Sequence, residues 1–132
     1  MIYGIVRGTS KEANESHVMK GWVVGHMYEG LMGTPEFEIK TWQYDGPIDY
    51  GKKRFGGTEF IIIYGGVLRF EIEQDTRGGI QRDAVVIRGD DKEYVIFPPG
   101  IEKTVVVVES PAFGVTVRWP SGPGVNKVLD KS

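Results

Sequence analysis

Short apolar segments recur about every ten residues along most of the chain, separated by glycine, proline and acidic turn residues. Each segment is four to eight residues long and rich in β-branched or aromatic side chains, which is typical of β-strands. Short strands with turns between them, and almost no helix, predict an antiparallel β-sandwich or barrel. We expect strands over residues 21–27, 37–44, 58–64, 67–73, 84–87, 94–97, 103–108 and 113–119.

Alternation of apolar and polar residues assigns the faces of two of these segments. Leu68, Phe70 and Ile72 share one face of the segment 67–73, and the charged residues between them lie on the other, solvated face. The segment 113–119 also has one apolar face, formed by Phe113, Val115, Val117 and Trp119.

Glycine and proline pairs mark the expected ends of several strands. Gly65-Gly66 predicts a tight hairpin turn between the segments 58–64 and 67–73, because the favoured hairpin turns need positive φ. Ser110-Pro111 separates the last two strands, and residues 74–81 are expected to form a loop.

The length of 132 residues predicts one domain with its own hydrophobic core. We expect an N-terminal extension with the first strands over residues 1–36, a barrel core over 37–119 and a C-terminal tail over 120–132. Within the extension, the segment from Thr9 to Ser16 predicts a short helix that has Thr9 or Ser10 as its N-cap.

The composition narrows the functional classes. The chain has no cysteine, which excludes disulfides, thiol catalysis and cysteine-ligated metal centres and fits a reducing cytoplasm. A net charge of −2 gives no overall field that would attract nucleic acid. The first eight residues lack the apolar region of a signal peptide, and the longest apolar run, 60–64, is far shorter than a membrane helix. We therefore expect a cytoplasmic protein that binds neither nucleic acid nor membranes.

A spaced set of glycine, charged and proline residues runs through the middle of the chain. Its members are Gly46, Lys52, Arg54, Glu59, Gly66, Pro98, Gly100 and Lys103. Their spacings resemble the two sequence motifs of the cupin family of small β-barrels. The glycine that opens the second motif is not at its usual distance before Pro98, which implies a longer turn or a bulge there. The resemblance covers about residues 37–119 and implies an all-β, cupin-like antiparallel barrel of the jelly-roll type, also called a double-stranded β-helix.

The residues at the ligand positions of this motif differ from those of metal-binding cupins. By the resemblance, Lys52, Arg54 and Lys103 stand where those cupins have histidines, and Glu59 stands at the acidic ligand. Arginine is never a metal donor in proteins, and lysine must first lose a proton. One carboxylate among three cations would repel a divalent ion, so we expect no metal and no other cofactor.

The same four residues predict a different kind of pocket. If the segment around Lys52 is extended, Lys52 and Arg54 share the barrel interior with Glu59 and Lys103. We expect Lys52, Arg54, Glu59 and Lys103 to bind a small anionic or carbohydrate-like ligand.

Other interpretations stay open at this point. The basic residues at 52–54 can form a solvated loop, with Glu59 paired to one of them for structural reasons. A shift of one residue would turn Lys53 and Phe55 inward instead. The resemblance also admits a sugar isomerase or epimerase, although such cupins use a histidine base, and a non-catalytic accessory domain. It implies a homodimer as well, since cupins commonly pair by lending edge strands to a neighbour.

Overall fold

The computed structural model describes residues 4, 6–15, 20–48, 51–122 and 126–128. A short helix, α1 (Ser10–Glu15), and a single 3-10 turn, η1 (Gly30–Met32), accompany the strands of the described part. The strands are β1 (Trp22–Val24), β2 (Glu38–Tyr44), β3 (Lys53–Phe55), β4 (Thr58–Thr76), β5 (Gly79–Arg88), β6 (Tyr94–Phe97), β7 (Glu102–Trp119) and β8 (Asn126–Val128). All pairs between these strands are antiparallel, so the all-β, antiparallel prediction is confirmed.

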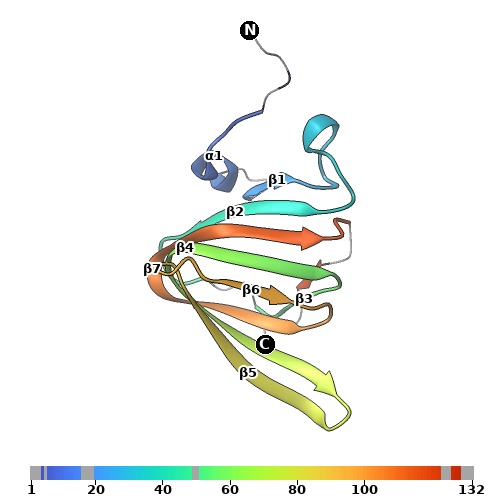
Figure 1. The fold of residues 1–132 in the computed structure, drawn as a ribbon, viewed down its shortest axis with the longest axis vertical. Helices are drawn as coiled ribbons and strands as arrows, with labels where there is room; N and C mark the ends of the chain where they lie inside the picture. The colour runs from blue at the N-terminus through green and yellow to red at the C-terminus, as the bar shows by residue number, and fades with distance from the viewer. Residues whose placement is uncertain (1–3, 5, 16–19, 49–50, 123–125, 129–132) are drawn as a thin grey trace.

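Two long strands, β4 and β7, form the frame of the barrel. They pair side by side from Thr58 opposite Trp119 to Glu73 opposite Glu102 (Figure 1). The register shifts repeatedly between Ile63 and Leu68, so both strands bend there. The half of β4 before the bend also pairs with β6, and the half after it pairs with β5. Each long strand therefore contributes to both walls around the interior.

The diglycine lies inside β4, so the hairpin turn predicted at Gly65-Gly66 is wrong. Gly66 does have a positive φ of 77°, as a tight turn would require. The glycines instead allow a close crossing, because a Cβ on Gly65 would overlap the ring of Phe113 and one on Gly66 would overlap the backbone around Ala112. The diglycine correctly predicts a backbone conformation that only glycine adopts easily, but such a conformation occurs in a bend inside a strand as well as in a turn.

Three other boundaries also differ from the prediction. Ser110-Pro111 lies inside β7, opposite the bend of β4, and does not end a strand. The expected loop at 74–81 is mostly strand, because β4 and β5 pair down to Thr76 opposite Gly79. The expected tail contains β8, which pairs with β3.

The core fills the interior between the walls. Leu68 and Phe70 point inward and are almost completely buried, as the alternation in 67–73 predicts. The ring of Phe70 meets that of Phe97 edge-on, with 5.1 Å between centroids. The buried apolar cluster comprises Trp42, Ile61, Ile63, Leu68, Phe70, Ile87, Phe97, Ile101 and Ala112.

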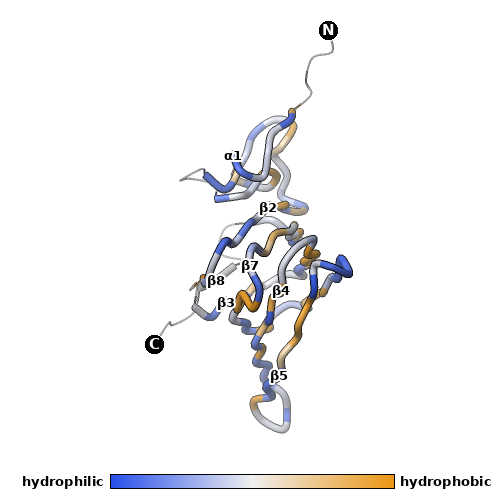
Figure 2. The backbone as a smooth tube through the Cα atoms, turned by 90° about the vertical axis from the view of Figure 1, so that its left-hand side faces the viewer, coloured by the Kyte–Doolittle hydropathy of each residue, from blue (hydrophilic) through white to orange (hydrophobic). Residues whose placement is uncertain are grey.

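The N-terminal region covers one end of the sheet. The predicted helix is confirmed as α1, and the Thr9 side chain accepts a hydrogen bond from the Glu12 backbone N–H, as an N-cap does. Asn14 ties the helix to the sheet by donating to the carbonyl oxygen of Thr41 in β2. Figure 2 shows α1 and the β4–β5 hairpin at opposite ends of the molecule. Neither helical element in the described ranges has the length and apolar character needed to cross a bilayer.

Candidate functional site

A buried ion cluster lies where the two long strands face each other. Glu59 points inward from β4 and is 1% exposed, while Lys103 and Arg118 point inward from β7 and are 6% and 8% exposed. Lys103 Nζ lies 2.6 Å from Glu59 Oε1, and Arg118 Nε donates to Glu59 Oε2. Arg118 is directly opposite Glu59 in the ladder, whereas Lys103 comes from the other half of the bent strand.

The two cations determine the protonation state of Glu59. Burial alone would raise the pKa of this carboxyl, but the charges of Arg118 and Lys103 and their hydrogen bonds outweigh that effect. The pKa of Glu59 is therefore held below its ordinary value of 4.5. Glu59 is an anion at neutral pH, and it is already occupied by two partners.

A cavity of about 50 Å³ borders the cluster inside the barrel. Lys40 from β2 and Lys53 from β3 line it together with Glu59, Lys103 and Arg118. Among the described residues of the lining, four side chains are cationic and one is a carboxylate. Apolar contacts complete the wall through Trp42, Tyr44, Ile61, Leu68, Phe70 and Val105.

The pKa of Lys40 reflects the positive charge around this cavity. Burial, followed by the charges of Lys53 and Arg118, lowers the pKa of Lys40 from 10.5 to about 8. Glu59 acts in the opposite direction but does not restore the ordinary value. An anion placed near Lys40 would relieve this repulsion.

Aromatic rings hold the cations in place. The guanidinium of Arg118 lies 4.9 Å from the Trp22 ring centroid and 5.1 Å from that of Phe55. The ammonium of Lys103 lies 5.0 Å from the centroid of Phe97. Such contacts stabilise a cation without neutralising it, so the charge remains available to a ligand.

A chain of polar contacts runs from Arg118 through Glu38 and Ser121 to His26 at the surface. Glu38 Oε1 lies 3.8 Å from Arg118 Nη1, and Glu38 Oε2 accepts a hydrogen bond of 3.0 Å from the hydroxyl of Ser121. The Ser121 oxygen lies 2.6 Å from His26 Nδ1 and accepts from the His26 backbone N–H. His26 is exposed, while Glu38 and Ser121 are buried. The chain of contacts fixes the orientation of Arg118 toward Glu59.

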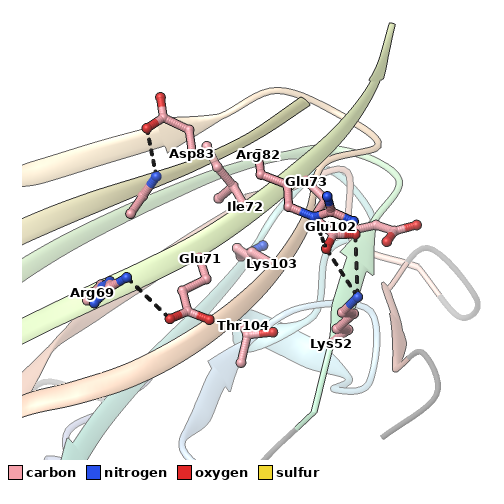
Figure 3. A pocket seen from close by; sticks show the side chains of 11 residues that line it. Lys52, Arg69, Glu71, Ile72, Glu73, Arg82, Asp83, Glu102, Lys103 and Thr104 are labelled. Carbon is pink, nitrogen blue, oxygen red and sulfur yellow. Dashed lines mark hydrogen bonds and ion pairs between the residues drawn. The ribbon is translucent and has the colours of Figure 1, made fainter. Parts of the chain in front are cut away.

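The structure brings together only two of the four predicted site residues. Glu59 and Lys103 meet inside the barrel, but Lys52 and Arg54 lie outside it. Arg54 pairs with Glu102, and Lys52 Nζ lies 3.3 Å from Glu73 Oε1 (Figure 3). The expected convergence of Lys52 and Arg54 with Glu59 is therefore wrong.

The register of β3 explains this correction. Lys53 is directly opposite Lys103 in the β3–β7 ladder, and Arg54 is opposite Glu102. Residues directly opposite each other share a face, so Lys53 joins Lys103 inside while Arg54 joins Glu102 outside. Phe55 is consequently buried. The structure therefore has the alternative register, in which Lys53 and Phe55 face inward in place of Lys52 and Arg54.

Two larger hollows lie apart from the centre of the cluster. A groove of about 310 Å³ runs between the β4–β5 hairpin and β7, where Lys52, Glu73 and Arg82 lie close together (Figure 3). Lys103 lines both this groove and the inner cavity. A hollow of about 630 Å³ lies between α1, β1 and η1, and its lining contains none of the cluster residues. The described lining of the groove has four carboxylates beside its four cations, whereas that of the inner cavity has one carboxylate beside four, so the inner cavity has the excess of positive charge.

The donor set of the inner cavity does not fit a divalent metal. Glu59 is its carboxylate and already binds two cations, and the remaining charged groups of the described lining are lysines and an arginine. The described residues include no group of three or more histidine, cysteine, aspartate or glutamate side chains suited to a metal ion. The neighbouring charges would repel a divalent ion at this position.

Comparison with known proteins places the fold. No family model and no curated protein matches the chain. Among solved structures, an oxalate oxidase in complex with the substrate analogue glycolate is similar with a TM-score of 0.60 and 17% identity, over 74% of this chain and 48% of that one. The oxalate decarboxylase of Bacillus subtilis gives a TM-score of 0.60 and 12% identity, over 72% of this chain and 24% of that one.

Both of these proteins are cupins, and the chain has a cupin-like β-barrel fold, as the spacing of its glycine, charged and proline residues predicts. The chain spans about half the length of the oxalate oxidase and about a quarter of the oxalate decarboxylase. At these identities the likeness shows the fold alone.

Proposed function

We propose that the barrel interior binds a small anion directly through protein cations, without a metal. The observation that carries the proposal is the convergence of Lys40, Lys53, Lys103 and Arg118 on one small cavity that contains the single carboxylate Glu59 among its described lining residues. Buried cations favour a bound anion because the low dielectric strengthens their attraction. The lowered pKa of Lys40 supports the same conclusion.

The size of the cavity favours the smallest anions. A cavity needs roughly 10–15 Å³ to hold one water molecule, so about 50 Å³ holds a few waters or an anion of a few heavy atoms. Carboxylates such as formate, acetate, glycolate and oxalate are of this class. The names of the two structural neighbours contain glycolate and oxalate, which agrees with the class. A sugar phosphate is too large for the cavity as it stands, so we narrow the expected anionic or carbohydrate-like ligand to a small carboxylate.

The four cations of the cavity have different roles in the proposed binding. Arg118 and Lys103 are held by Glu59 and by aromatic rings, so they form a fixed wall. Lys40 and Lys53 enter from two other strands, β2 and β3, and line the same cavity. A ligand that binds between them gains charge-assisted hydrogen bonds without displacing the Glu59 pairs.

The described residues that line the cavity give no specific support for a sugar isomerase or epimerase activity. His26 contacts Ser121 and Glu38 rather than the cavity, and Glu59 is an engaged anion instead of a proton donor. The accessory-domain interpretation predicts that no ligand binds. Location in the cytoplasm and the absence of nucleic-acid and membrane partners stay predictions of the composition.

Calorimetric titration with formate, acetate, glycolate, oxalate and phosphate tests the proposal. Each anion is titrated to millimolar concentrations, with and without a strong chelator, and chloride serves as the matched salt. We expect at least one small carboxylate to bind equally in both conditions and to raise the melting temperature in the same order. Failure of every anion to bind contradicts the anion site, and binding that the chelator abolishes contradicts the metal-free mode.

A further inference from the structure

The outward side of β4, β6 and β7 carries a concentration of exposed apolar side chains. Tyr94 is 62% exposed, Ile96 52%, Tyr64 47%, and Phe113 and Trp119 are each 41% exposed. We call these five residues, with the side chains that lie between them, the outer face. The apolar face predicted for 113–119 is thus real, but it points away from the barrel interior.

Strand register shows that the outer face is continuous. Phe60 in β4 is opposite Val117 in β7 on one side and Ile96 in β6 on the other. One step along, Ile62 is opposite both Val115 and Tyr94. Opposed residues share a face, so these rows join the exposed side chains into one surface across neighbouring strands.

Ring contacts confirm this arrangement. The rings of Phe60 and Tyr94 stack with 5.5 Å between their centroids. The adjoining β2 positions on the same side are Ile39, Thr41 and Gln43, each opposite an outward residue of β7. None of the residues placed on this surface is charged.

The area of the outer face matches one half of a protein interface. Its four exposed aromatic residues alone leave roughly 300–500 Å² accessible, taking about 150–250 Å² for each whole side chain. That is already near the roughly 300–600 Å² of the largest apolar patch on a typical monomer. With Ile96 and the half-buried rows between the rings, it approaches the roughly 800 Å² that each partner contributes to a standard interface.

We propose that the outer face packs against the same face of a second copy of this chain. An isologous pairing of this kind brings two uncharged, apolar sheet surfaces together and desolvates no ion. A membrane surface is a poorer occupant, because membrane-binding faces normally combine apolar residues with several lysines and arginines, and none of the residues placed on this face is cationic. The contact differs from pairing through edge strands, since it uses the face of the sheet and leaves its edges free.

Two matched isoleucines test the proposal. Ile96 lies on the outer face, and Ile80 lies in β5 with a similar exposure of 57%. We expect sedimentation velocity to show a dimer for the wild type and for Ile80→Glu, and a monomer or an at least tenfold weaker dimer for Ile96→Glu. Circular dichroism establishes that both variants are folded.

A second measurement covers the case in which Ile96→Glu does not fold. The chain has no cysteine, so Ile96→Cys and Ile80→Cys each carry a single reporter thiol. We expect alkylation of Ile96→Cys to slow as the protein concentration rises, and alkylation of Ile80→Cys to stay constant.

Three results would overturn the inference. They are a wild type that stays monomeric at high concentration, a dimer that Ile80→Glu breaks while Ile96→Glu does not, and a monomer that binds neutral lipid vesicles. None of them affects the anion site, whose ligand titration is independent of self-association.

Discussion

Removal of the Glu59 charge is expected to destabilise the barrel strongly. The variant Glu59→Gln keeps the size of the side chain but leaves Lys103 and Arg118 buried without their carboxylate. Breaking a buried ion pair by removing one partner costs about 3–5 kcal/mol. For a chain of 132 residues, an unfolding entropy of about 2 cal/mol/K per residue converts this cost to a melting temperature lower by roughly 10–18 °C.

The matched control is Glu73→Gln. Glu73 also pairs with two cations, Lys52 and Arg82, but this network lies at the surface. Solvent screens such pairs, so we expect little change in the melting temperature. Thermal unfolding followed by circular dichroism, with urea titration for the free energy, measures both variants. Equal and small effects of the two substitutions would refute the idea that the Glu59 cluster is buried and tightly coupled.

The pH dependence of stability provides a second test of the Glu59 cluster. The pKa of Glu59 is lowered in the folded protein, so its contribution to stability is present above the unfolded value of about 4.5. That contribution is lost as the pH falls through the lower, folded pKa. The difference in stability between wild type and Glu59→Gln should therefore shrink in acid, and a difference that grows there would contradict the assignment.

Three further substitutions have defined outcomes. Lys40→Met should stabilise the protein below pH 8 by up to about 3 kcal/mol, because the folded wild type holds a protonated amine whose pKa is lowered from 10.5 to about 8. The wild type should gain stability as the pH rises between these two values, and the variant should not. Denaturant titrations that give parallel pH profiles for the two proteins would contradict this. Ser121→Ala should cost about 1–3 kcal/mol in thermal unfolding, since buried Glu38 loses a hydrogen-bond donor, and an unchanged melting temperature would show that this contact is not needed. Gly89→Ala should cost about 2 kcal/mol or more in the same assay, because its Cβ would overlap the backbone of Gly65, and a neutral effect would place that crossing further apart.

The fold was predictable because its signals are local. Strand-length apolar segments, Leu68 and Phe70 on one face, and the N-cap at Thr9 depend on residues close in sequence, and the structure has all of them. The bend at Gly65-Gly66 was not predictable, because a turn and a bend make the same demand on the backbone. Only pairing with β7 along the whole of β4 decides between them.

The site was predictable only in part for a different reason. Glu59 and Lys103 were found through motif spacing, but the inward face of 52–54 depends on register with Lys103 across the sheet. Arg118 had a signal in the sequence, since it alternates with Trp119 and Val117. That signal is ambiguous, because the apolar face of this strand points outward and the polar one lines the cavity.

The most direct test of the anion site compares two neighbouring residues of β3. Lys53→Met removes a charge that lines the cavity, and Arg54→Met removes one that points outward toward Glu102. The anion found to bind best to the wild type is titrated calorimetrically into both variants. We expect at least tenfold weaker binding for Lys53→Met and unchanged binding for Arg54→Met. Loss of binding in Arg54→Met with full binding in Lys53→Met would contradict the account.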